Sequence, residues 1–371
     1  MEQILGHENA KNILRSALRS GRVHHAWIFH GPQGVGKRTL AASVARVLLC
    51  HDASAGAQGQ MCGRCASCRL DDDSHPDLHL IHKELAAVSD FRHLRERKQM
   101  NIPVDLLRER MIGGRVGETY IEPAVGLRPM LNHGKVFLVD EADLLDATGQ
   151  NALLKTLEEP PPGTYLFLIT SHEERLLPTI RSRCQRIGFS SLEDEMVGSW
   201  LGVQPSAQAI SAQQRAWVVQ FARGSIGRAA LSLEYRLDTW AQTVGPMIDR
   251  VAAGRPDVEM GTAMAGLVDG FAEAWVKQHK GASKEAANKA GARHMLGLVA
   301  EFCRLRLADV AAQADPGDLP GAEDAARPWL VGIELVQEAE RNLESNVHLG
   351  LLLDNLAIQW SAQVRGSRVK V

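Results

Sequence analysis

The sequence predicts an α/β fold over about residues 1–190, with a parallel sheet and helices on both faces, followed by helical domains. Short apolar runs alternate there with helical patterns, which is typical of a parallel sheet that is covered on both sides. The expected buried strands are 25–31, 78–82, 135–141 and 165–171. The expected helices between them are 8–20, 37–49, 103–112 and 146–158.

After about residue 190 the strand pattern stops, and a chain of 371 residues has room for two or three domains. Residues 191–240 are expected to form a small helical unit and residues 241–371 a larger helical domain. The stretches 253–257, 280–291 and 313–328, rich in Gly, Ala, Asp or Pro, are expected to interrupt the helices of that last domain.

The formal net charge of −2 gives the chain no general attraction to nucleic acid or membranes, so a DNA contact needs a local basic patch. No stretch approaches the ~20 apolar residues of a membrane span, and the first residues lack the apolar core of a signal peptide. We therefore expect a cytoplasmic protein. Disulfides are rare in that compartment, so the six cysteines favour metal binding.

The stretch GPQGVGKRTL (31–40) matches a phosphate-binding loop at Gly31, Gly36 and Lys37. An expected strand precedes it and an expected helix follows it, as the motif requires. Its glycines, Gly34 among them, let backbone N–H groups turn toward a phosphate, and Lys37 would reach the outer phosphates of a nucleotide. The alternative is a glycine-rich turn with a surface lysine.

The loop departs from the motif at Arg38, where a Ser or Thr hydroxyl normally binds Mg²⁺. Arg38 has no acceptor atom and cannot ligate a cation. Thr39 lies about 100° further around the helix, so it is not expected to substitute. Nucleotide binding by this loop, including Arg38 and Thr39, stays possible, but Arg38 argues against ATP hydrolysis with Mg²⁺.

The run VFLVDEAD (136–143) predicts a second phosphate-handling element. Asp140 follows an apolar strand and can hold Mg²⁺, and Glu141 can orient the attacking water. Either acid can instead be a solvated strand end. Their occurrence together with the phosphate loop favours the catalytic interpretation.

Four cysteines, Cys50, Cys62, Cys65 and Cys68, have the spacing C-x11-C-x2-C-x2-C. Four thiolates with two CxxC steps suit a tetrahedral, structural Zn²⁺ site. An iron–sulfur cluster and free thiols are the alternatives. Cys184 and Cys303 lie apart from this group.

Beyond these motifs, the sequence contains SHPDLHLI (74–81), the long run from Val136 to Phe189, and GSIGRA (224–229). Together they resemble bacterial DNA polymerase III clamp-loader subunits of the AAA+ class, over about residues 3–235. The resemblance implies a P-loop domain (1–190) with an inserted zinc module, a lid (191–240) and an oligomerisation collar (241–371).

Two groups within this family are candidates. The motor subunits (gamma/tau) have an intact phosphate loop and are usually longer. The delta-prime group often has a degenerate loop and about this length, so Arg38 and residues 74–81 favour it. The retained Asp140 and Glu141 favour the alternative, a motor subunit or another AAA+ ATPase. A DNA-binding repair protein of this class would need a strong basic surface, which the sequence does not indicate.

The resemblance also implies roles for single residues. Arg183, in the motif Ser-Arg-Cys, is similar to an arginine finger that acts in trans; by itself it would be taken for a surface salt bridge. Thr170, with Ser171, resembles a first sensor of the γ-phosphate, or else a strand-end cap. Arg228 resembles a second sensor, or else a relic of one.

The family further implies a hetero-pentamer with gamma/tau and delta subunits that opens a sliding clamp and places it on primed DNA. In it, this chain would be the stationary arm. Residues 84–101 have no assigned role and are expected to be a solvated surface segment.

Overall fold

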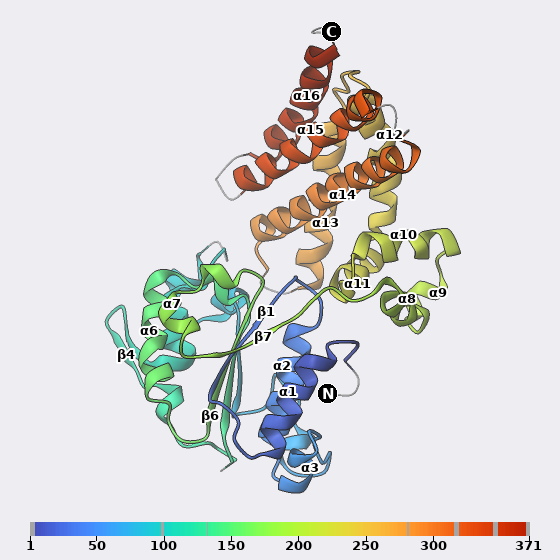
Figure 1. The fold of residues 1–371 in the computed structure, drawn as a ribbon. Coiled ribbons are helices and arrows are strands. Elements are labelled where there is room, and N and C mark those ends of the chain that lie inside the picture. Colours follow the sequence, from blue (N-terminus) through green and yellow to red (C-terminus); the bar gives the residue numbers. More distant parts are fainter. Residues whose placement is uncertain are drawn as a thin grey trace. The chain divides into compact units, whose positions relative to one another are not determined.

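The computed structural model describes residues 4–97, 100–131, 133–279, 282–314, 319–343 and 348–368. The chain divides into two compact units (Figure 1). The first consists of Met1–Ala209 and Ala222–Ala230, and the second of Ile210–Phe221 and Leu231–Val371.

A five-stranded parallel sheet forms the centre of the first unit, in the order β2-β5-β6-β1-β7. Its strands are β1 (Ala26–His30), β2 (Leu78–Ile81), β5 (Lys135–Val139), β6 (Thr164–Thr170) and β7 (Gln185–Gly188). The four predicted strands are confirmed. The sequence did not predict β7, because this edge strand buries only Ile187 and so lacks an apolar run. It also missed the hairpin of β3 (Gly114–Val116) and β4 (Thr119–Ile121).

The two faces of this sheet carry separate hydrophobic cores, because successive residues of a strand point to opposite sides. Trp27 and Phe29 of β1 pack in the core that contains Leu40 of α2. Ile28 packs in the other core, with Leu153 of α6. The helices of the first unit are α1 (Glu8–Arg19), α2 (Lys37–Leu48), α3 (Ala53–Ala57), α4 (Arg92–Arg95), α5 (Val104–Leu107), α6 (Ala147–Glu158), α7 (Pro178–Arg181), α8 (Asp194–Gly202) and α9 (Pro205–Gln208).

The segment after β2 is only in part the solvated surface that the sequence suggested. Ala86 and Leu94 are buried in the core beside the sheet, and the Ser89 hydroxyl donates to Glu109 at 2.5 Å. Residues 98 and 99 of this stretch lie outside the described residues.

The helices α12 to α16 build the core of the second unit, around residues such as Leu353 and Trp360. The remaining helices are α10 (Ala212–Ala222), α11 (Ile226–Glu234), α12 (Leu237–Ala252), α13 (Met260–Gln278), α14 (Lys284–Gln313), α15 (Leu319–Leu343) and α16 (Leu349–Arg368). Among the described helices, none is long and apolar enough to cross a membrane.

The helices are interrupted within the last two predicted stretches, between α13 and α14 and between α14 and α15, but the interruptions are shorter than predicted. Within 280–291, the Ser283 side chain accepts the N–H of Ala286 at 3.3 Å and starts α14. Within 313–328, α14 extends to Gln313 and α15 begins at Leu319; Pro320 in its first turn costs no helical hydrogen bond, and Pro328 lies inside the helix. Residues 280–281 and 315–318 lie outside the described residues.

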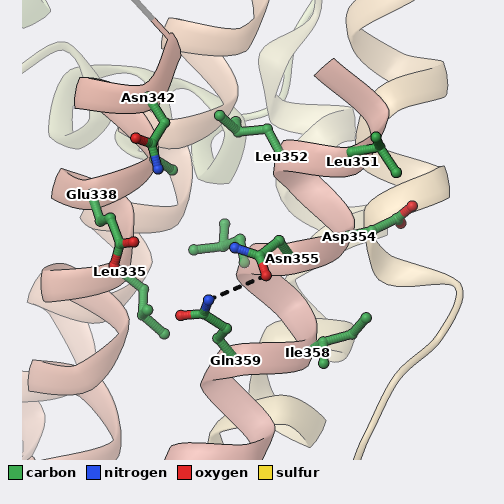
Figure 2. Close-up of a pocket in the computed structure, with 11 residues that line it drawn as sticks. Leu335, Glu338, Asn342, Leu351, Leu352, Asp354, Asn355, Ile358 and Gln359 are labelled. Carbon is green, nitrogen blue, oxygen red and sulfur yellow. Dashed lines mark hydrogen bonds between the residues drawn. The ribbon is translucent and has the colours of Figure 1, made fainter. Parts of the chain in front are cut away.

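A groove with a cavity volume of about 440 Å³ lies between α15 and α16 (Figure 2). Leu335 and Glu338 line it from α15, and Asn355 and Gln359 line it from α16, where they share a hydrogen bond of 3.2 Å. Leu351 on α16, which also lines it, is 67% exposed. The groove is therefore partly apolar and open to solvent.

Candidate nucleotide site and cysteine cluster

The phosphate loop follows β1 and leads into α2, as predicted. Its three glycines all have positive φ: 135° at Gly31, 75° at Gly34 and 107° at Gly36. Gly31 also lies against the chain after β7, where a Cβ atom would lie 2.1 Å from the backbone oxygen of Phe189. The loop therefore needs glycine at this position for backbone geometry and for space.

Lys37 is buried at the start of α2 and folds back over the loop. Its Nζ donates to the carbonyl oxygens of Gly31 at 2.6 Å and Pro32 at 2.7 Å, and to the Ser171 hydroxyl at 3.3 Å. Burial lowers the pKa of Lys37 to about 8, against the charges of Asp140 and Asp143, which raise it. The lysine thus lies where the motif places it.

The start of α11 lies directly on the loop. The Ser225 hydroxyl donates to the Gln33 carbonyl at 3.0 Å, and the Gly227 N–H donates to the Gly34 carbonyl at 2.8 Å. The Arg228 N–H in turn donates to the Ser225 hydroxyl at 3.1 Å. The fold therefore brings the helix of the second candidate sensor next to the phosphate loop.

Arg38 and Asp140 form an ion pair at the mouth of the loop. The Arg38 guanidinium lies 3.5 Å from the Asp140 carboxylate, and its side chain is 55% exposed. Thr39 is exposed one position further along the helix. A divalent cation needs oxygen ligands, and here a guanidinium lies beside the carboxylate that should provide one. The residues present therefore do not fit a bound Mg²⁺.

The other acids at this edge of the sheet also have partners within the chain. Lys83 Nζ lies 2.7 and 2.6 Å from the two carboxylate oxygens of Glu141. Burial raises the pKa of Glu141, and Lys83 opposes that rise. The Thr170 hydroxyl donates to Asp143 at 2.6 Å. No motif in the sequence pointed to Lys83 or Asp143, because both act through contacts with residues that the fold brings near.

Arg183 lies at the opposite edge of the sheet from the phosphate loop. Strands β1 and β7 run parallel. Arg183 comes just before the start of β7, which lies beside Trp27. The phosphate loop follows the end of β1, where His30 pairs with Gly188. With about 3.3 Å per residue, roughly 13 Å separate the two edges. The Arg183 side chain is partly exposed and contacts the Glu158 carboxylate at 2.7 Å.

The four predicted cysteine ligands come together in space. Their sulfur atoms all lie within 4.8 Å of one another, and those of Cys62 and Cys68 are 4.0 Å apart. Zinc with four sulfur ligands at about 2.3 Å places sulfurs about 3.8 Å apart, so the donor set and the spacing fit. The N–H groups of Cys62 and Cys68 donate to the sulfurs of Cys50 and Cys65 at 3.4 Å.

The SHPD part of residues 74–81 links the cysteine segment to the sheet. A hydrogen bond of 2.9 Å joins the His75 ring to the hydroxyl of Ser67, beside Cys68. The buried Asp77 carboxylate accepts the N–H groups of Met130 and Leu131 at 2.7 and 2.8 Å. These residues therefore have structural contacts in this chain.

Comparison with known proteins shows which family this chain belongs to. The sequence matches the family described as "DNA polymerase III, delta subunit" over residues 6–193. The DNA polymerase III subunit delta' of Escherichia coli K12 is 30% identical over 319 residues, which are 79% of this chain and 85% of that protein. The subunit delta' of Bacillus subtilis 168 is 30% identical over 50% of this chain and 48% of that protein.

Similarity extends to the other subunit type as well. The DNA polymerase III subunit gamma/tau of Mycobacterium tuberculosis H37Rv is 32% identical over 194 residues, or 51% of this chain. The matched part is only 28% of the gamma/tau protein.

Proposed function

This chain belongs to the DNA polymerase III delta-subunit family of AAA+ clamp-loader proteins, and from this premise we propose that it is a delta-prime-type subunit. In this role it supplies Arg183 in trans to the ATP site of a neighbouring motor subunit during DNA replication. Its own ATPase activity is weak or absent.

The position of Arg183 carries this proposal. The Arg183 backbone lies roughly 13 Å along the strands from the chain's own phosphate loop, which is more than an arginine side chain spans, and the side chain contacts Glu158 instead. The Arg183 side chain is 37% exposed and so can reach a neighbour. An arginine finger in trans contributes about 10³–10⁵-fold to turnover by stabilising charge on the γ-phosphate.

The state of the chain's own loop supports the same role. Arg38 faces Asp140 at 3.5 Å, and Lys83 holds Glu141, so neither acid is free to handle Mg²⁺ or water. We propose a structural Zn²⁺ held by Cys50, Cys62, Cys65 and Cys68. The ion would hold together a segment that is otherwise poor in apolar residues.

For the assembly, we propose a hetero-pentamer with gamma/tau and delta subunits that acts on the sliding clamp and primed DNA in the cytoplasm. The functional division is a P-loop domain (1–190), a lid (191–240) and a collar (241–371). The groove beside α16 supports the collar role, since it offers exposed Leu351 and Ile358 for contacts with a neighbour.

A motor subunit is the second candidate. Gly31, Gly36 and Lys37 keep the phosphate loop, Asp140 and Glu141 are retained, and the gamma/tau relatives match half of the chain. In that case the chain would hydrolyse ATP in spite of Arg38.

Measurement of ATP turnover separates these functions. Motor subunits are reconstituted with clamp, primed DNA and either the wild-type chain or Arg183→Ala, and the purified chain is assayed alone. The delta-prime role requires that the chain alone is inactive and that Arg183→Ala sharply lowers turnover by the assembly. Turnover by the chain alone that Lys37→Ala abolishes, with no effect of Arg183→Ala, identifies it as an ATPase.

A further inference from the structure

Three acids that follow β5, at the same end of the sheet as the phosphate loop, are occupied by groups of the chain itself. Arg38 pairs with Asp140, Lys83 with Glu141, and the Thr170 hydroxyl bonds to Asp143. In a P-loop site that uses Mg²⁺, acids of this kind balance the divalent ion and orient water. Here Arg38 and Lys83 already balance Asp140 and Glu141, and a neutral hydroxyl engages Asp143.

We propose that Arg38 is a built-in replacement for the divalent cation, so that this phosphate loop accepts a polyphosphate without Mg²⁺. The guanidinium lies beside the carboxylate that would ligate the ion, and it extends from the position that normally supplies the second protein ligand. Arg38 thus removes the hydroxyl ligand of Mg²⁺ and places a positive charge beside Asp140.

Electrostatics explains why the Arg38 guanidinium and a Mg²⁺ ion exclude each other at Asp140. A guanidinium stays protonated at any pH relevant to the protein, so its charge is permanent. The Asp140 side chain is only 20% exposed, and charges interact more strongly near such partly buried groups than in water. A Mg²⁺ ion at Asp140 would therefore have to displace Arg38 or share the carboxylate with it.

The same arrangement offers a polyphosphate what it needs. Lys37 and Arg38 are the first two residues of α2, where the helix dipole and the N–H groups of the loop favour an anion. Without a bound metal ion, the phosphate oxygens of a nucleotide are unshielded. Arg38 can contact such oxygens through two N–H groups. The ligand class is thus a nucleoside polyphosphate or inorganic polyphosphate free of divalent cation.

A fluorescent ATP analogue tests this directly with the full-length chain. Its affinity is measured in EDTA and in millimolar Mg²⁺ for the wild type, Arg38→Thr, Arg38→Lys and the exposed control Arg22→Thr. We expect the affinities of the wild type, Arg38→Lys and Arg22→Thr to differ less than about threefold between the two conditions. We expect Arg38→Thr to bind at least about tenfold tighter with Mg²⁺ than without it.

Binding of Mn²⁺, followed by its paramagnetic resonance, gives a second readout that needs no nucleotide turnover. Arg38→Thr should gain a bound ion in the presence of ATP, and the wild type should not. Arg38→Gln replaces Arg38→Thr if the latter does not fold. The proposal is overturned if the wild type binds Mn²⁺ with ATP, needs Mg²⁺ for ATP, or binds no ATP in EDTA. None of these results depends on Arg183, so the trans role can stand or fall separately.

Discussion

The Arg183 guanidinium lies 2.7 Å from the Glu158 carboxylate, and this contact links the second residue after α7 to the last residue of α6. The two side chains are 37% and 50% exposed. Ion pairs between exposed groups contribute only about 0–1 kcal/mol, because water screens the charges and both side chains lose freedom. Glu158 therefore positions Arg183 without fixing it, and a neighbour's phosphates can compete for it.

Replacing Glu158 with Gln tests this relationship. The unfolding free energy should fall by no more than about 1 kcal/mol, measured by urea denaturation. In the reconstituted assembly, ATP turnover should stay the same or rise, since the guanidinium, which still donates to the Thr179 carbonyl at 3.0 Å, is more available to the neighbour. A drop as large as that of Arg183→Ala would mean that the ion pair itself is needed for function.

Lys37 should make stability depend on alkaline pH. Burial lowers its pKa from 10.5 to about 8 in the folded chain, so between these values the unfolded chain holds a proton that the folded chain has lost. The unfolding free energy due to Lys37 therefore rises with pH across this window, by up to about 3 kcal/mol. The unfolding free energy of the wild type should therefore rise relative to that of Lys37→Met as the pH increases. Denaturation at a series of pH values measures this difference.

The surface variant Lys155→Met is the control for this pH series. Its stability relative to wild type should not follow the rise seen against Lys37→Met. A constant difference between wild type and Lys37→Met from pH 8 to 10.5 would contradict the lowered pKa.

Gly31 should be the most demanding glycine of the phosphate loop. An alanine there would have φ near 135° and its Cβ atom 2.1 Å from the Phe189 oxygen. Gly117 in the β3–β4 turn is a matched control, because its φ is 59° but no atom lies within 4 Å of a new Cβ. Gly31→Ala should cost about 1–3 kcal/mol more unfolding free energy than Gly117→Ala. Equal losses would show that the neighbouring chain gives way.

Much of the first unit could be predicted because its signals are local. Buried strands appear as short apolar runs, and the phosphate loop and the cysteine spacing are contiguous motifs. The strand β7 gave no such signal, since Gln185 and Arg186 are exposed on the sheet edge and only Ile187 is buried. The interruptions before α14 and α15 were predicted too long, because Ser283 caps the start of α14 and α15 contains Pro328 in its interior.

The partners of the site residues could not be read from the sequence. Lys83 meets Glu141 across 58 positions, and Arg38 meets Asp140 across 102. Such pairs depend on two parallel strands ending at the same edge of the sheet, which a motif does not encode. The sequence therefore indicated which residues lie at the site, and the fold added how their charges are paired.

The cysteine cluster should hold one zinc ion per chain. Cys62→Ser or Cys65→Ser removes one sulfur ligand from the half-buried part of the cluster and should lower the zinc content measured by mass spectrometry. The structural role predicts a second effect: cleavage by a protease within residues 50–70 should become faster in these variants and in chelator-treated wild type, because few apolar contacts hold this segment. Cys184→Ser is the matched control, since that thiol lies outside the cluster, and it should keep its zinc. Unchanged metal content in Cys62→Ser, or equal protease resistance with and without metal, would contradict a structural zinc at this position.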